Sequence, residues 1–126
     1  MTKIIKTLTI SDAMLNEISG GRRLPVSKFT GVIEIKEQTS YVSILGRRCK
    51  GKKEIYASFI VTEDVDICME DIHSGKVYEA IGVVSGERKS EQLIFAGLRY
   101  DDMDPITGQV VFEITDLELI RKMLAM

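Results

Sequence analysis

Alternation of apolar and polar residues from Phe29 onward is the feature that most constrains the fold of this chain. Gly31, Ile33 and Ile35 fall on one face, and Thr30, Val32, Glu34 and Lys36 on the other, which is typical of a half-buried strand. Further short strands are expected at 41–45, 54–61, 76–84, 93–99 and 110–114, with turns at 37–39 and 104–108 and a loop at 46–53. Strands this short and this closely spaced favour a mainly β fold, a small antiparallel barrel, over a doubly wound sheet.

Helices are expected only where capping residues precede apolar stretches. Ser11 is a good N-cap for a short helix over 12–18, which Gly20 and Gly21 would end. Thr62 can cap a second helix reaching about residue 72, between the third and fourth strands of the barrel. Residues 116–126 look like a C-terminal helix or a strand continuing into one. The predicted organisation is therefore an N-terminal arm with a short helix (1–27), of which 1–10 could instead be a short strand, then a β-barrel (28–120) and a helical end (121–126).

Length and composition indicate one domain. The chain has 126 residues, of which 44% are hydrophobic and 29% charged, as in an ordinary globular protein. Its longest apolar runs are far too short to cross a bilayer, so no membrane partner is expected. With no secretory signal and only Cys49 and Cys68, the expected location is a reducing cytoplasm in which both thiols stay free.

Charge is distributed unevenly along the chain. Residues 1–61 contain eleven Lys or Arg and five Asp or Glu, whereas residues 62–126 contain six and fourteen. If the two halves stay apart in space, the folded domain has one basic and one acidic surface. The alternative is that this asymmetry carries no function.

Three segments resemble the oligonucleotide/oligosaccharide-binding (OB) fold of bacterial single-stranded-DNA-binding proteins and their primosomal relatives. They are the glycine-bearing strand Thr30–Ile35, the segment 72–84 with Gly75-Lys76 before a strand and Gly82 inside it, and the closing hairpin 96–120. The resemblance covers about residues 28–120 and implies an OB-like barrel that binds single-stranded nucleic acid. The sequence departs from this family in having no Trp and in offering both 76–84 and 93–99 as the fourth barrel strand.

The strongest candidate site is a basic segment predicted as a loop between the second and third strands. It places Arg47, Arg48, Lys50, Lys52 and Lys53 within seven residues. Phosphates would relieve the mutual repulsion of these charges and release counterions. Four further basic residues could extend the patch: Arg22, Arg23, Arg88 and Lys89. The alternative is a solvated hairpin tip whose charges prevent edge aggregation.

Aromatic residues flank the basic segment. If Leu45 pairs with Glu54, Tyr41 and Tyr56 lie diagonally on the outer face of the second and third strands, where an OB fold stacks bases. Alternatively, both pack beneath the N-terminal arm or a second copy of the chain. The four phenylalanines are expected in the core: Phe29, Phe59, Phe95 and Phe112.

Metal and catalytic patterns are weak. Asp102, Asp104 and Glu113 match part of a calcium-loop spacing, but Thr107 stands where the sharp turn needs Gly. His73 and two scattered cysteines make no zinc pattern, and no nucleophile elbow or phosphate-binding loop is present. Neither a cofactor nor enzymatic activity is expected. The favoured function is non-catalytic binding of single-stranded DNA or RNA; the alternative is a protein–protein interaction module or inhibitory factor acting through an acidic surface.

Overall fold

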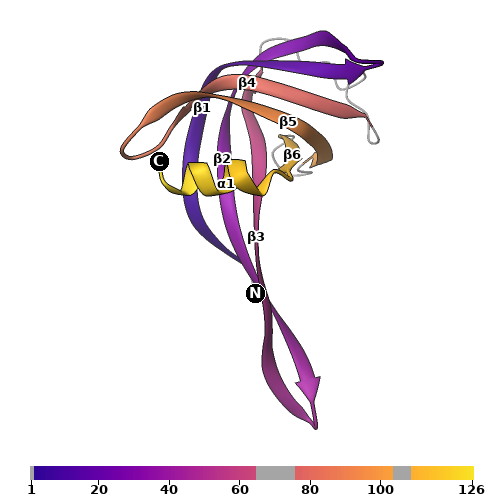
Figure 1. Cartoon of the computed structure of the whole chain (residues 1–126), viewed down its shortest axis with the longest axis vertical. Coiled ribbons are helices and arrows are strands. Elements are labelled where there is room, and N and C mark those ends of the chain that lie inside the picture. Colours follow the sequence, from indigo (N-terminus) through magenta and orange to yellow (C-terminus); the bar gives the residue numbers. More distant parts are fainter. Residues whose placement is uncertain (1, 65–75, 104–108) are drawn as a thin grey trace.

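The computed structural model describes residues 2–64, 76–103 and 109–126. In these residues the chain forms six strands and one helix (Figure 1). The elements are β1 (Thr2–Ser19), β2 (Arg22–Ile44), β3 (Arg47–Asp64), β4 (Val77–Ser85), β5 (Ser90–Met103), β6 (Val110–Ile114) and α1 (Leu117–Leu124).

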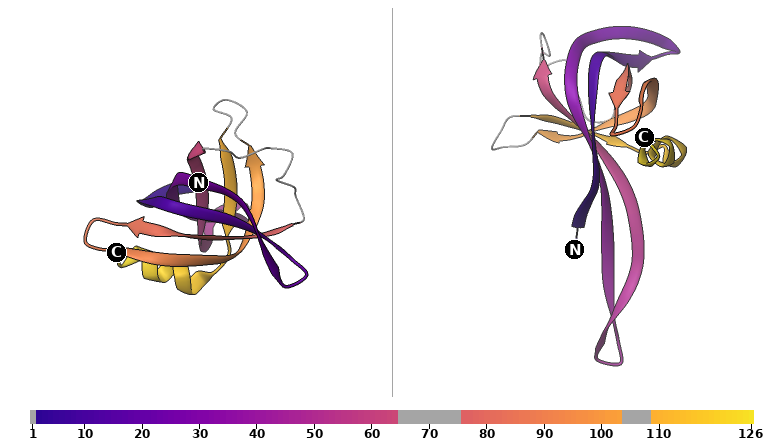
Figure 2. Two further views of the ribbon diagram at one scale, coloured as in Figure 1. Left: turned by 90° about the horizontal axis from the view of Figure 1, so that it is seen from above. Right: turned by 90° about the vertical axis from the view of Figure 1, so that its left-hand side faces the viewer.

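The strands pair in one closed antiparallel ring, in the order β1-β2-β3-β6-β5-β4 (Figure 2). Two meanders, β1–β3 and β4–β6, join at both edges, where β1 pairs with β4 and β3 pairs with β6. The expected mainly β, antiparallel, closed arrangement is therefore confirmed. The two segments that competed as fourth strand, 76–84 and 93–99, both lie in the ring as β4 and β5. The ring thus has six strands, one more than the five of an OB fold.

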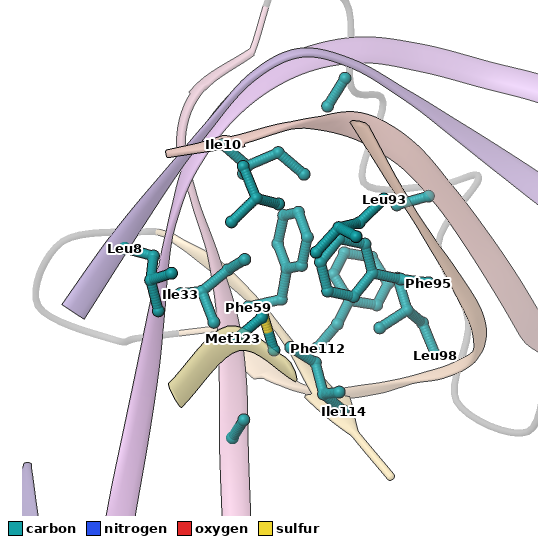
Figure 3. Close-up of a cluster of buried hydrophobic side chains, with 14 of the residues drawn as sticks. Leu8, Ile10, Ile33, Phe59, Leu93, Phe95, Leu98, Phe112, Ile114 and Met123 are labelled. Carbon is teal, nitrogen blue, oxygen red and sulfur yellow. The ribbon is translucent and has the colours of Figure 1, made fainter. Parts of the chain in front are cut away.

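The hydrophobic core fills the inside of the ring (Figure 3). All four phenylalanines are buried, as expected, and Phe59 makes edge-to-face contacts with Phe29 and Phe95, with ring centres 5.1 and 5.4 Å apart. Phe112 makes the corresponding contact with Tyr78 at 5.5 Å. Edge-to-face geometry aligns the positive ring edge with the negative ring face, so these pairs fix the packing as well as filling space.

The helix predicted over 12–18 is wrong, because this segment is part of β1. A bulge at Ser11 and Asp12 shifts the register of β1 against both β2 and β4, and Asp12 has a φ of 50°. Before the bulge the even-numbered side chains Leu8 and Ile10 point into the core, and after it the odd-numbered side chains Ala13 and Leu15 do so. Since β1 pairs on both sides within the ring, it is not an arm.

Gly31 shows how tightly β2 and β3 approach. A Cβ at this position would lie 2.6 Å from the Ile60 carbonyl oxygen, at a bulge where Thr30 and Gly31 pair with Glu63 and Val61. Only glycine fits at this position without moving the backbone.

Three other local predictions are corrected by β2 and β3. The turn expected at 37–39 and the loop expected at 46–53 both lie in continuous strands that meet at Leu45 and Gly46. Thr62 does not cap a helix: it lies in β3, and its hydroxyl donates to the Thr30 carbonyl oxygen at 3.2 Å. The rest of that predicted helix and the turn at 104–108 fall outside the described residues.

The C-terminal helix is confirmed, over Leu117–Leu124. The Asp116 carboxylate caps it by accepting from the backbone N–H groups of Glu118 and Leu119. Its buried residues Ile120 and Met123 pack against the ring (Figure 3).

Candidate functional site

The five clustered basic residues lie on a long β-ribbon that projects from the ring (Figures 1 and 2). β1 pairs with β2 only as far as Gln38, and β6 pairs with β3 only over residues 57–60. Residues 39–53, called the ribbon below, therefore consist of β2 and β3 alone. From the rise of a strand, the ribbon is about 20 Å long. The predicted loop is in fact a strand and its turn.

The ribbon bends at a bulge near its base. Thr39 pairs with Lys53 and Tyr41 with Lys50, so Gly51 and Lys52 together lie opposite Ser40. The Ser40 hydroxyl donates to the Lys52 carbonyl oxygen at 3.2 Å, and a Cβ on Gly51 would lie 2.9 Å from Ser40 backbone and side-chain oxygens. Gly51 thus permits the close approach that the bulge requires.

One face of the ribbon combines an aromatic ring with two cations. Tyr41 pairs with Lys50 and Ser43 with Arg48, and paired residues point to the same side of a sheet. The Arg48 guanidinium lies 4.3 Å from the centre of the Tyr41 ring, a cation–π contact. Tyr41 remains 43% exposed, so part of its ring surface is open to a ligand. We call these four residues the tyrosine face.

Two of the five basic side chains are paired with carboxylates and three are not. Lys53 Nζ lies 3.4 Å from Glu37 Oε1, and Lys52 Nζ lies 3.9 Å from Glu54 Oε1. Within the part of the chain that the structure describes, no ion pair forms at Arg47, Arg48 or Lys50. The outer half of the ribbon therefore carries unneutralised positive charge.

The opposite face of the ribbon is aliphatic. Val42 pairs with Cys49 and Ile44 with Arg47; Val42 is 48% exposed and Ile44 55%. Leu45, at the turn, is 99% exposed. The sequence did not identify these residues as one face of a ribbon. The Leu-Gly pair lacks the Asn or Asp that usually signals a tight hairpin turn, so a loop was expected in place of the turn and the strand that follows it.

Tyr56 does not join Tyr41, contrary to the register assumed from the sequence. Tyr56 pairs with Lys36, five residues before Tyr41 on β2, so the two tyrosines lie about 16 Å apart along the strand and, by alternation, on opposite faces. Tyr56 is half-buried, and Lys36 Nζ lies 5.9 Å from the centre of its ring. The structure therefore offers one exposed tyrosine on the ribbon rather than a pair.

Arg22 and Arg23 begin β2 at the far end from the ribbon, after the β1–β2 turn (Figure 1). Arg23 Nε lies 2.9 Å from Oε1 of Glu79, whose side chain is only 9% exposed. Arg23 and Glu79 line an open pocket of about 560 Å³. The two charges neutralise each other there, so Arg23 does not extend the basic ribbon.

Arg88 and Lys89 lie in the β4–β5 turn beside the end of α1, also away from the ribbon (Figure 1). The Arg88 backbone N–H donates to the Met126 carbonyl oxygen at 2.9 Å. Glu91 contacts both Lys122, at 2.8 Å, and Lys89, at 3.1 Å. Hydrogen bonds from these two ammonium groups, first Lys122 and then Lys89, lower the pKa of the Glu91 carboxyl. This turn therefore serves to attach the helix.

The described residues offer few features of a metal site, a reactive thiol or a membrane span. Among the described residues no group of three His, Cys, Asp or Glu side chains is placed to hold a metal ion. Cys68, His73 and Asp104 lie outside those residues, so the free-thiol prediction for Cys68 stays a prediction, and Cys49 is half-buried in β3. None of the helices in the described ranges has the length and apolar character needed to span a membrane.

Comparisons with family models, with curated proteins and with solved structures give no match for this chain.

Proposed function

We propose that this chain binds single-stranded DNA or RNA, without catalysis, through the ribbon. The observation that carries the proposal is the placement of two unneutralised cations, Arg48 and Lys50, on the same face as the exposed ring of Tyr41, on an element that projects from the ring of strands. A third unneutralised cation, Arg47, lies beside them on the opposite face of the ribbon. Phosphates bind cations and bases stack on aromatic rings. The tyrosine face offers cations for phosphates and an aromatic ring for a base within one pair of strands.

The electrostatics of the ribbon support an anionic ligand. Like charges crowded on a narrow ribbon repel each other, and no described carboxylate offsets the three at its outer half. A strand of phosphates removes that repulsion and releases condensed counterions, which gives affinity without sequence preference. The Arg48 guanidinium already lies over the Tyr41 ring, 4.3 Å from its centre, so a base stacked nearby would extend an existing cation–π arrangement.

An OB-like relationship is part of the proposal. It is supported by a small closed antiparallel sheet whose second and third strands carry the candidate site, as in OB folds. The ring has six strands, and no known protein matches the chain, so the proposed relationship to OB folds concerns the architecture alone.

A protein partner is the second candidate, and the aliphatic face favours it. Val42 and Ile44 are both about half exposed and lie on the side of the ribbon away from Tyr41. Exposed aliphatic residues on a strand pair are typical of protein interfaces. This candidate predicts binding that depends on Val42 and Ile44 and is nearly independent of salt.

Salt dependence separates the two functions. If the ribbon engages three to four phosphates, the logarithm of affinity for a ~20-nucleotide single strand falls with the logarithm of salt concentration at a slope of about −2 to −3. Replacing Arg47 and Arg48 together by Ala flattens this slope by about one unit or more, for every sequence tested. The measurement is fluorescence anisotropy of a labelled oligonucleotide, titrated at several salt concentrations.

The matched control is Arg88→Ala with Lys89→Ala, which also removes two positive charges, but from the β4–β5 turn. We expect this control to keep the wild-type slope. If the wild-type protein shows no affinity for the strand even at about 50 mM salt, the nucleic-acid proposal is wrong and the protein-partner candidate leads.

A further inference from the structure

The turn at the end of the ribbon places a large apolar side chain in an unfavourable backbone conformation. Leu45 has a φ of 52° and Gly46 a φ of 75°, as in a two-residue turn with both central residues left-handed. Gly, Asn and Asp adopt this conformation readily, whereas Leu does so at a cost in free energy.

Among the residues that the structure describes, no contact of the Leu45 side chain offsets that cost. It is 99% exposed, at the point of the molecule farthest along the ribbon from the ring (Figure 1). Its neighbour Ile44 is 55% exposed, so the end of the ribbon is apolar on its aliphatic side. Backbone strain together with full exposure of an apolar group points to a contact outside the chain.

The charges around Leu45 indicate what that contact is. Arg47 and Arg48 follow the turn directly, and neither is paired with a carboxylate among the described residues. A protein groove that received Leu45 would have to bury or neutralise both guanidinium groups. In a nucleic acid, by contrast, phosphates flank every base step, so cations and an apolar side chain are accommodated together.

We propose that Leu45 is a wedge that inserts between two adjacent bases of the strand that the ribbon holds. This proposal rests on the proposed function and deepens it. Arg47 and Arg48 contact the phosphates on either side of the step, and the isobutyl group replaces the base–base contact. Leu, Ile, Phe and Met side chains inserted between base steps of duplex DNA unstack the bases in architectural proteins, and the same contact is available at a base step of a single strand. Tyr41, four residues away on β2, then stacks on a base farther along the strand.

The test measures base stacking directly, at saturating protein. The probe is a ~20-nucleotide oligodeoxyadenylate with one aminopurine at its centre, a fluorescent adenine analogue that brightens when it is unstacked. Wild-type protein should raise the fluorescence by about twofold or more, through separation of the bases at the step that it occupies. Leu45→Asn, which suits the turn and removes the wedge, should lose most of this rise and keep the salt slope of binding.

Two further variants control the comparison. Leu45→Met keeps an apolar side chain of similar size and should keep the rise in fluorescence. Ile94→Thr removes an exposed aliphatic residue from β5, where Ile94 is 55% exposed, and should change nothing. Quenching by Tyr41 is the same in all four proteins, so it cancels in the comparison.

The outcomes separate this inference from the function on which it rests. If wild-type protein binds the strand with the expected salt slope but Leu45→Asn gives an equal rise in fluorescence, the wedge is wrong and the binding function stands. If wild-type protein does not bind the strand, both fail. If it instead co-floats with anionic lipid vesicles and Leu45→Asn abolishes that, the apolar tip is a membrane contact and the wedge is likewise overturned.

Discussion

At the scale of single residues, Tyr41 and Tyr56 show how neighbours determine what an aromatic side chain can do. Tyr41 is 43% exposed on a ribbon that, among the described residues, consists of two strands, and the Arg48 guanidinium lies 4.3 Å from the centre of its ring. Tyr56 is half-buried at the base of the ribbon, opposite Lys36. A base can stack only on a ring face that water already reaches. Tyr41 meets this condition far better than Tyr56.

The two tyrosines should therefore differ as mutants. We expect Tyr41→Ala to weaken single-strand binding by about 1–3 kcal/mol and to leave the salt slope nearly unchanged, because stacking releases few counterions. Tyr56→Ala should weaken binding much less. Anisotropy titrations at fixed salt, repeated at two higher salt concentrations, measure both quantities. Equal losses for the two variants would contradict the assignment of the site to the tyrosine face.

At the scale of elements, the ribbon is a two-stranded sheet without a core of its own. Such hairpins are marginally stable in water. This one is continuous with strands that are fixed in the ring, so its base is anchored at the pair Gln38 and Glu54. Because the ribbon packs on nothing in the described fold, its removal should cost the ring little.

Removal of the ribbon tests whether the ribbon provides binding and the ring provides stability. Gln38 and Glu54 are cross-strand partners, as are Ile44 and Arg47 at the natural turn, so an Asn-Gly pair can replace residues 39–53. We expect the shortened protein to unfold cooperatively at nearly the wild-type melting temperature and to lose nucleic-acid binding. Circular dichroism melting and anisotropy measure the two effects. A shortened protein that still binds the strand would place the site on the ring.

The ribbon also explains which parts of the fold could be predicted from the sequence. Alternation marks a strand only where one face is buried, and it correctly located strands at 29–36 and 54–61, of which 29–35 and 57–61 line the core. Both faces of the ribbon are exposed, so 46–53 has no such pattern and resembles a loop. In β1 the bulge at Asp12 interrupts the alternation, and a helix cap was inferred instead. The basic cluster itself was visible, because charge composition needs no knowledge of register.

At the scale of the whole molecule, the fold separates the basic cluster from the other candidate residues. The ribbon carries Arg47, Arg48 and Lys50 at one extreme of the molecule, whereas Arg22 and Arg88 lie on other turns of the ring (Figures 1 and 2). A chain with a net charge of −2 can therefore still present a localised positive pole. Such a pole orients the protein as it approaches an anionic strand and raises the rate of association at low salt.

The attachment of α1 to the ring gives a test of stability against pH. Glu91 on β5 contacts Lys122 on α1, and its lowered pKa means that the folded state binds the proton at Glu91 less readily than the unfolded chain does. Its stabilising contribution is therefore fully present above the ordinary Glu pKa of about 4.3 and is lost as the pH falls through the lowered folded value. We expect Glu91→Gln to have a lower urea midpoint than wild type at pH 7, a difference that shrinks as the pH falls below the ordinary Glu pKa of about 4.3. Glu87→Gln, at an exposed residue of the same turn with no ion pair among the described residues, is the control and should follow the wild-type curve. Parallel curves for wild type and Glu91→Gln over the whole pH range would show that the ion pair with Lys122 does not hold α1 against the ring.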